Sequence, residues 1–475
     1  MKHDTVRIGI AFVGSVLGLI SPIFGQSSDE QPRVNPTPAN STNIQLRYGV
    51  QARMMANASN FSFHSKSINF SQDSHSFANM RLRSWVNLGS FQADGYGLYT
   101  QFELGHVPFE TNNDGPISSS MNGFDGLELR RSFFWFMLDD NTQVRFGLQG
   151  WSDMFSNSIS KGSDLYAIDD YDFASSILAN SVWDFNVPGL NVFGSFDDST
   201  HYRMGVFALS EGDRTLSGNG SAYLIAADYD QGFDGHRMGA SVYYLADKGD
   251  YSYGTFGGPQ TAYGSSQDLW IGLRGAFQLD NWDPTYALIY NRGGTSDPNW
   301  DHQGWAGKLE MSRGLGEGKV SLLAMASTGD DGSGESNEFR TIAQGARDNL
   351  GSQGYWGYLP ITSPHGPSDV NDLGISLQNQ GLGLLTMQGA WAQPITGHLD
   401  SVVAMGYLAS AEKNPMSGHR DLGSEVALMM NWKPRPMVGI QFGIAYLFAG
   451  GFFDGPGGGS SDDLREIFLR MQLEF

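Results

Sequence analysis

The fold is decided by the stretch IQLRYGVQARM at residues 44–54, in which apolar and polar side chains alternate without a break. One face carries Ile44, Leu46, Tyr48, Val50, Ala52 and Met54, and the other carries Gln45, Arg47, Gly49, Gln51 and Arg53. Successive side chains of a β-strand point to opposite faces of its sheet, so a period of two residues predicts a strand with one apolar face.

The same alternation recurs along the rest of the chain. Leu269, Ile271 and Leu273 share one face of such a segment, and Arg274 lies on the other. Pro188 makes the segment 180–196 the least regular, because proline cannot donate a ladder hydrogen bond. The sequence predicts strands near 43–56, 77–89, 95–105, 127–138, 142–150, 180–196, 201–209, 221–230, 236–246, 267–279, 284–292, 303–313, 318–327, 381–392, 398–409, 421–433, 437–449 and 463–475.

The connections between these segments fall into two alternating populations. Short ones lie at 139–141, 280–283, 314–318, 394–397 and 434–436. Long polar ones lie at 57–76, 106–126, 151–179, 247–266, 328–380 and 450–462. A sandwich or a propeller has no reason to alternate them, whereas an outer-membrane barrel has short periplasmic turns and long external loops. We therefore predict an all-β fold, a transmembrane antiparallel up-and-down β-barrel of 16–18 strands, with 18 as the count from the segments.

Composition agrees with this fold and excludes several functions. The 475 residues include 62 Gly, only 40% are hydrophobic and the net charge is -21, while the mean hydropathy is -0.30. Such an acidic chain offers no basic surface for nucleic acid. Cysteine is absent, which excludes disulfides, thiolate metal sites and covalent c-type haem. No catalytic motif is present, so we expect no enzyme activity, no cofactor and no metal site.

The N-terminus has the pattern of an export signal. Lys2 and Arg7 precede the apolar run 8–20, and small residues up to Gly25 follow it. The alternative is a membrane anchor, but the apolar run is shorter than the roughly 20 residues that a spanning helix needs. We predict a cleaved secretory signal at 1–25, a flexible lead-in at 26–42 and the barrel at 43–475, placed in the bacterial outer membrane.

The C-terminus gives an independent signal. The last strand alternates two sets of side chains, and the chain stops at Phe475. One set is Ile467, Leu469, Met471, Leu473 and Phe475, and the other is Glu466, Phe468, Arg470, Gln472 and Glu474. This resembles the last strand of bacterial outer-membrane barrels, in which a final Phe is part of what the insertion machinery recognises. The alternative is a strand that ends at the last residue by chance.

One family resemblance can be named. The stretch DLGSEVALMMNWKPRPMVGIQFGIAYLFAGGFF at 421–453, followed by DDLREIFLRMQLEF at 462–475, resembles the C-terminal part of the alginate-export family of outer-membrane porins. The stretch LELRRSFFWFMLDDNTQVRFGLQG at 127–150 is a looser match to an early hairpin of that family, with Leu148 where an Arg is expected. The resemblance implies an 18-stranded barrel that conducts polar solute.

The inward face of the barrel is its functional surface, because barrels of this size leave an aqueous lumen. Arginines are concentrated there on the first strands and would attract anions. Lys308 and either Arg130 or Arg131 extend this set. The predicted pore-lining residues are Arg47, Arg53, Arg81, Arg83, Arg145 and Arg274. The alternative is that the arginines only brace the wall, by pairing with Glu103, Glu128, Glu310, Glu425 and Asp184.

The long connections offer further candidates. Loop 151–179 either folds into the lumen as a constriction or lies outside in solvent. In the first case Asp164, Asp169, Asp170 and Asp172 would face the arginines. Other acidic loop residues, such as Asp330 and Asp462, match no calcium-binding pattern, and we read them as solvated. Aromatic residues near segment ends predict membrane-interface girdles: Trp305, Tyr407, Trp432, Tyr446 and Phe448.

Three functions remain open from the sequence. The first is a porin for small hydrophilic solutes, with a preference for anions. The second is an exporter of acidic, alginate-like polysaccharide, whose lumen should be basic along its full height. The third is a structural or sheath barrel that holds a partner protein. Expected partners are outer-membrane lipid and lipopolysaccharide, the barrel-insertion machinery acting on Phe475, and the solute or polysaccharide. A homo-oligomer is compatible with the strand pattern.

Overall fold

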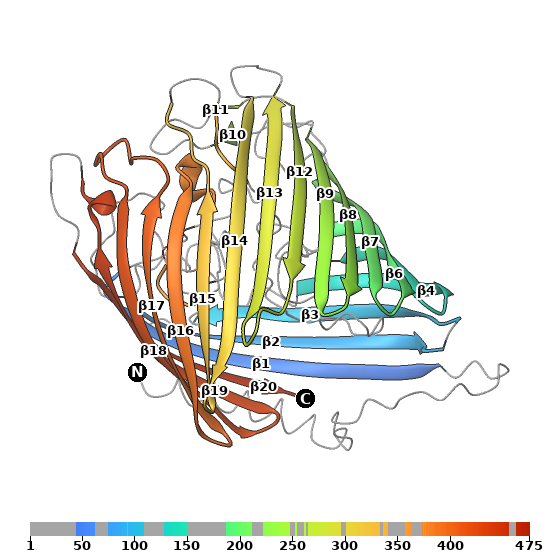
Figure 1. Cartoon of the computed structure of the whole chain (residues 1–475). Coiled ribbons are helices and arrows are strands. Elements are labelled where there is room, and N and C mark those ends of the chain that lie inside the picture. Colours follow the sequence, from blue (N-terminus) through green and yellow to red (C-terminus); the bar gives the residue numbers. More distant parts are fainter. Residues whose placement is uncertain are drawn as a thin grey trace, which may run out of the picture. The chain divides into compact units, whose positions relative to one another are not determined.

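A computed structural model gives the fold of the chain (Figure 1). The structure describes residues 44–61, 75–92, 94–108, 128–149, 187–210, 222–247, 252–253, 261–262, 265–295, 301–332, 336–340, 357–362, 373, 375, 377–455 and 462–475. Among these residues, no helix is both long and apolar enough to span a membrane.

The described elements are β-strands and two short 3-10 turns. The strands are β1 (Gln45–Ser59), β2 (His75–Ser90), β3 (Tyr96–Pro108), β4 (Glu128–Asp139), β5 (Thr142–Gln149), β6 (Val187–Asp197), β7 (Thr200–Ser210), β8 (Ala222–Phe233), β9 (His236–Asp247), β10 (Ser252–Tyr253), β11 (Thr261–Ala262), β12 (Ser266–Ala276), β13 (Asp283–Thr295), β14 (His302–Leu315), β15 (Gly318–Ser327), β16 (Leu384–Thr396), β17 (Leu399–Ser410), β18 (Asp421–Arg435), β19 (Val438–Ala449) and β20 (Leu464–Glu474). The 3-10 turns are η4 (Asn379–Gly381) and η5 (Gly451–Phe453).

Eighteen of the strands form one antiparallel sheet, and β10 pairs with β11 in a separate hairpin. Each strand of the large sheet pairs with the next one along the chain, and β9 pairs with β12 across that hairpin. The first strand pairs with both β2 and β20, with Gln51 opposite Glu474. This pairing closes the sheet into a barrel and confirms the predicted fold and strand number.

The two ends of the barrel differ in their connections. At the short-turn end, two-residue turns join most of the strand pairs, and the β2–β3 and β12–β13 connections are five and six residues long. Asp234 and Gly235 form one such turn with φ values of 39° and 80°, the left-handed conformation that tight hairpins favour and that Asp and Gly tolerate. Every second connection, at the long-loop end, is longer. The least regular predicted segment, 180–196, contains the start of β6 at Val187, and Pro188 is the second residue of that strand.

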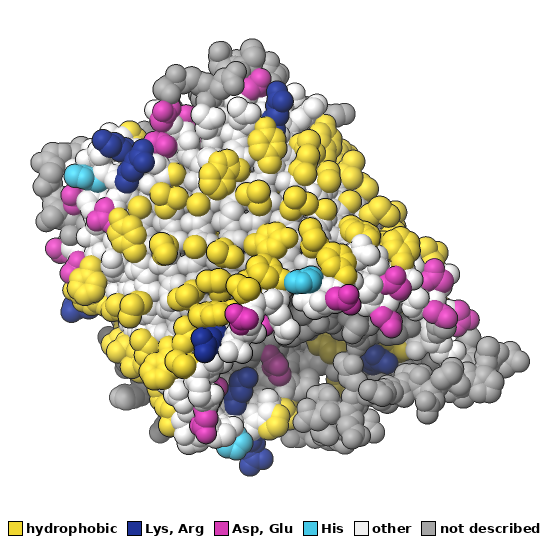
Figure 2. All heavy atoms as spheres, in the orientation of Figure 1, with side chains coloured by type: hydrophobic (Ala, Val, Ile, Leu, Met, Phe, Trp, Pro, Cys, Tyr) yellow, Lys and Arg dark blue, Asp and Glu magenta, His cyan; other side chains and the backbone are white. Residues whose placement is uncertain are grey.

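The outer face is apolar, as the alternation predicts. In β12, Leu269, Ile271 and Leu273 are exposed while the residues between them are buried. Figure 2 shows hydrophobic side chains spread over the strands of this wall. Trp305 and Phe448 lie near the long-loop end, and Trp432 lies near the short-turn end; all three are about half exposed. This arrangement fits two aromatic girdles at the membrane interfaces.

The inner face carries both polar and apolar side chains. On β1–β9, buried charged and amide side chains lie beside apolar ones such as Phe133, Phe207 and Tyr243. On β12–β20, polar residues such as Asp268 and Glu425 are also buried, and many apolar inward residues form one cluster with residues of the β15–β16 and β19–β20 connections. That cluster includes Trp270, Ile289, Leu323, Leu384, Leu408, Leu447 and Phe468. The expectation of a purely polar inner face is therefore wrong.

The lipid-facing assignment can be tested at Ile271, which is 47% exposed on the outer face. Replacing Ile271 by Arg should destabilise the barrel by about 2–4 kcal/mol, because a lipid-facing charge near the middle of the membrane loses its hydration. Urea unfolding in phospholipid vesicles measures the loss. Ile271→Leu should leave stability unchanged within error, and an equally stable Ile271→Arg barrel would contradict the assignment.

Candidate functional site

The inner face of β1–β5 carries a group of arginines that we call the arginine wall. Its members are Arg47, Arg53, Arg81, Arg83, Arg130 and Arg145. Arg53 and Arg81 lie directly opposite each other on β1 and β2, and both are buried. Like charges in this position repel each other, so the sequence places positive charge on this wall at a cost in stability.

Glu103 on β3 is the carboxylate at the centre of this wall. It pairs with Arg83, and Arg130 Nη1 lies 2.9 Å from its Oε2 atom. Arg81 donates a hydrogen bond of 3.0 Å to Gln51 Oε1. All three arginines are at most 7% exposed. The Glu103 contacts show that bracing between strands, one of the two interpretations of the sequence, accounts for part of the wall.

A β-bulge explains why Arg130 faces inward. The register between β3 and β4 shifts between Gln101 and Phe102, so that Gln101 lies opposite Arg131 and Phe102 lies opposite Leu129. Arg130 is the extra residue, and a bulge of this kind redirects a side chain. Strict alternation could not assign Arg130 and Arg131 to a face, because it assumes that no residue is inserted in the ladder.

Arg47 and Arg145 differ from the other members because they lie over aromatic rings. Arg47 Cζ is 3.7 Å from the centroid of the Phe91 ring. Arg145 Cζ is 4.3 Å from the Phe193 centroid and 5.2 Å from the Phe133 centroid. The ring faces stabilise a guanidinium without neutralising it. Both side chains are half-buried, so their charge is more accessible than that of Arg83.

Arg274 belongs to a separate charged lattice on β7–β12. Its Nη2 atom lies 3.1 Å from Asp230 Oδ2, and its Nη1 atom lies 3.9 Å from Asp228 Oδ1. Arg203 and Arg237 pair with the same two carboxylates at 2.8 Å and 2.5 Å. Arg274 therefore spans two buried carboxylates in the wall, and its geometry is that of bracing.

The other acidic residues predicted to brace the wall have different partners in the structure. Glu310 lies 3.4 Å from Lys308 Nζ. Glu425 accepts hydrogen bonds from backbone N–H groups of a loop. The Glu128 side chain and Asp184 lie outside the described residues. The four carboxylates of the predicted constriction loop, Asp164, Asp169, Asp170 and Asp172, also lie outside them.

The sequence reasoning did not predict that parts of the β15–β16 connection lie against the inner wall. We call residues Gly357–Thr362 the strap. Glu425 on β18 accepts hydrogen bonds from the backbone N–H groups of Ile361 and Thr362, at 2.8 Å and 3.0 Å. Tyr358 donates its hydroxyl to Glu310 at 2.6 Å. Burial raises the pKa of the Tyr358 phenol, and the charge of Glu310 raises it further.

Residues 336–340 of the same connection attach to β12–β14. Arg340 Nη1 lies 3.0 Å from His302 Nδ1. A guanidinium can only donate, so Nδ1 is the acceptor in this contact. On the other side of the ring, His302 Nε2 lies 2.8 Å from Asp268 Oδ1. Asp268 and His302 flank Gly293, where a Cβ atom would come within 2.1 Å of Asp268, so the contact requires glycine.

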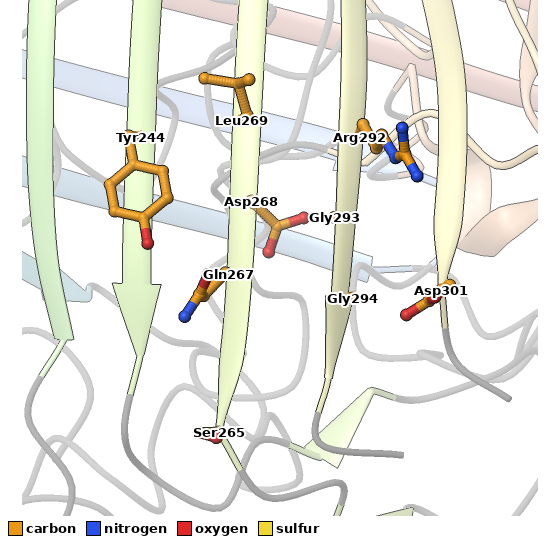
Figure 3. A pocket seen from close by; sticks show the side chains of 9 residues that line it. All are labelled: Tyr244, Ser265, Gln267, Asp268, Leu269, Arg292, Gly293, Gly294 and Asp301. Atoms are coloured by element: carbon orange, nitrogen blue, oxygen red, sulfur yellow. The ribbon is translucent and has the colours of Figure 1, made fainter. Parts of the chain in front are cut away.

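A separate pocket of about 480 Å³ lies near the long-loop end of β9, β12 and β13 (Figure 3). Gln267, Leu269 and Arg292 line it and are exposed on the outer face, with Asp301 beside them. Charges of both signs meet there. In the described part of the chain no cluster of three or more His, Asp or Glu side chains could hold a metal ion.

A closed 18-stranded antiparallel barrel with an apolar outer face defines the class of the protein. No family model matches the chain, and no curated protein matches it. Several solved structures match the chain. Acinetobacter baumannii OccAB2 is 8% identical with a TM-score of 0.53 and covers 90% of this chain and 98% of its own. Pseudomonas aeruginosa OpdQ is 10% identical with a TM-score of 0.52, covering 90% and 97%. Pseudomonas aeruginosa OccK2 (OpdF) is 13% identical with a TM-score of 0.51, covering 90% and 97%.

These similarities show the fold, which is that of outer-membrane porins. They do not show membership of the alginate-export family.

The charged lattice can be tested at Asp228, whose side chain is fully buried. Asp228→Asn should reduce the free energy of unfolding by about 3 kcal/mol, because Arg203 and Arg274 keep their buried charges without this counter-charge. Urea unfolding followed by tryptophan fluorescence measures the loss. The matched control is Glu412→Gln in the exposed pair with Arg420, which should cost less than about 1 kcal/mol. Equal losses in the two variants would contradict the bracing role.

Proposed function

We propose that the protein is an outer-membrane porin that forms an aqueous channel for small hydrophilic solutes, with a preference for anions. The observation that carries this proposal is the sign of the inner wall. On β1–β5 and β20 the inward charged residues with described side chains are mainly arginines, and their acidic neighbours are Glu103, Glu466 and Glu474. A wall with excess positive charge lowers the energy of an anion in the lumen.

Arg47 and Arg145 are the best placed to meet a solute. Both are partly exposed and lie over aromatic faces, and Arg145 Nε also donates a hydrogen bond of 2.7 Å to Gln143 Oε1. A guanidinium in this setting can still bind a carboxylate or phosphate through two parallel hydrogen bonds. Arg83 and Arg130 would act mainly through their field, because both are buried and each is already paired with Glu103.

An exporter of acidic polysaccharide, which the C-terminal resemblance implies, is favoured less. Such a channel needs a wide lumen that is basic along its full height. The inward residues of β12–β20 include the carboxylates Asp268 and Glu425 and a cluster of apolar side chains, and the strap lies on this wall. A sheath for a partner protein has the same difficulty, because these loop segments already take up space inside the barrel.

Export, insertion and lipid contacts complete the proposal. Residues 1–25 would direct the chain out of the cytoplasm and be removed, and the strand ending at Phe475 would be read by the insertion machinery. The apolar outer face of β12 and its neighbours would contact lipid and lipopolysaccharide. The N-terminal residues lie outside the described part of the chain.

Planar-bilayer recording tests the channel and its selectivity. The refolded protein should give discrete conductance steps, and a KCl gradient should give a reversal potential of the sign expected for anion preference. The double variant Arg47→Gln/Arg145→Gln should shift that potential toward zero, because it removes the accessible positive charge. The matched control is Arg292→Gln on the outer face, which should not shift it.

Two results would overturn this proposal. Protein that refolds but gives no conductance would contradict the porin function. A cation preference in the wild type would contradict the role of the arginine wall.

Signal cleavage has a direct test. Protein purified from outer membranes should have a mass that corresponds to loss of about 25 residues, the usual length of a secretory signal, and N-terminal sequencing should begin near Gln26. An intact N-terminus in membrane-inserted protein would contradict cleavage.

A further inference from the structure

The strap follows one row of side chains that runs across the strands. Gln388 on β16, Gly406 on β17 and Glu425 on β18 are direct neighbours in the sheet register. The row continues through Leu323 on β15 to Glu310 on β14. All of these positions belong to the inward face, because Leu323, Gln388 and Glu425 are buried in alternation with exposed outward residues.

Four residues of the strap contact this row. The Tyr358 hydroxyl donates to Glu310, and the Tyr358 backbone N–H donates to Gln388 Oε1 at 2.8 Å. Leu359 lies over Gly406, where an added Cβ atom would come within 2.9 Å of Leu359 Cδ1. Glu425 accepts hydrogen bonds from the two backbone N–H groups at the end of the strap, and also from the Thr362 hydroxyl at 2.7 Å.

The hydrogen bonds to Glu425 are the strongest of these contacts. Its side chain is fully buried, and a buried carboxylate is costly unless hydrogen bonds satisfy it. Three donors of the strap do so, and each bond to a charged acceptor is stronger than a neutral one. Leu359 and Ile361, both 0% exposed, add apolar burial in the same short segment. The carboxylate is therefore engaged with the strap.

We propose that Glu425 is the positioning residue of the strap and thereby sets the width of the channel on the β14–β18 side. Glu310, Gln388, Gly406 and Glu425 form a row of contact positions, which we call the track, and these contacts fix where Gly357–Thr362 crosses the wall. With the strap on its track, solute is directed toward the opposite, arginine-bearing side of the lumen. This inference rests on the proposed channel function.

Single-channel recording of Glu425→Gln tests this role. The amide presents one acceptor and one donor group where the carboxylate presented two acceptors, so at least one strap N–H group loses its partner. The fraction of time in a higher-conductance level should rise roughly 10- to 100-fold, the factor that corresponds to one lost hydrogen bond to a charged group. Thr362→Val, which removes only the hydroxyl bond, should have a smaller effect in the same direction.

A second variant reaches the strap from another position on the track. Gly406→Val fills the space beneath Leu359 and should raise the conductance in the same way, although it leaves Glu425 intact. The matched control is Glu412→Gln, an exposed glutamate outside the track, which should record as wild type. Wild-type traces from both Glu425→Gln and Gly406→Val would overturn the proposal.

Spin labelling separates this proposal from the channel function. The chain has no cysteine, so Gly357→Cys gives a single site at the start of the strap. The label should be immobilised in the wild-type background and mobile when Glu425→Gln is added, even if the protein conducts nothing. If the protein does not conduct but the label shows this change in mobility, the porin function is contradicted and the role of Glu425 is not. An unchanged spectrum would sink the role of Glu425.

Discussion

The structure depends on one constraint: in lipid, every backbone N–H and C=O group must find its partner within the protein. A sheet meets this constraint only when it has no free edge. The pairing of β1 with β20, over nine residue pairs from Gln51 to Ser59, removes the last edge. Closure also explains the composition of the chain, because each strand needs apolar side chains only on the face that meets lipid. A low apolar fraction is then compatible with a large membrane protein.

Because closure pairs the backbone groups and only the outer face meets lipid, the inner face need not be apolar. The chain lines this inner face in two ways. On β1–β9, buried ions brace neighbouring strands through shared carboxylates such as Glu103 and Asp228. On β12–β20, apolar side chains are covered by returning loop segments. A charged lattice can stay next to water, whereas an apolar wall must be covered because exposed apolar area costs about 25 cal/mol per Å². The strap is therefore a consequence of the apolar wall as well as a feature of the lumen.

The sequence predicted the strands and the outward face well because both follow from one period of two residues. It could not place Arg130, since a bulge breaks that period, and it did not anticipate the strap. A signal for the strap was present: SLLAMA at 321–326 and EVALMM at 425–430 are continuously apolar after their first residue. Strands that are covered on both faces have such runs. The partner of Glu425 could not be predicted, because it lies 64 residues away in a connection without periodicity.

The net charge of -21 is a poor guide to the channel. Several carboxylates lie in turns at the short-turn end, among them Asp140, Asp198 and Asp280. Adjacent turns are separated by two strands, or about 10 Å, which exceeds the Debye length of about 8 Å at physiological salt. Their charges are therefore largely screened from one another by the surrounding solution. The arginines on β1–β5 lie inside a low-dielectric wall, where screening is weaker, so under the proposed function the sign of the wall would govern what enters more than the sign of the whole chain.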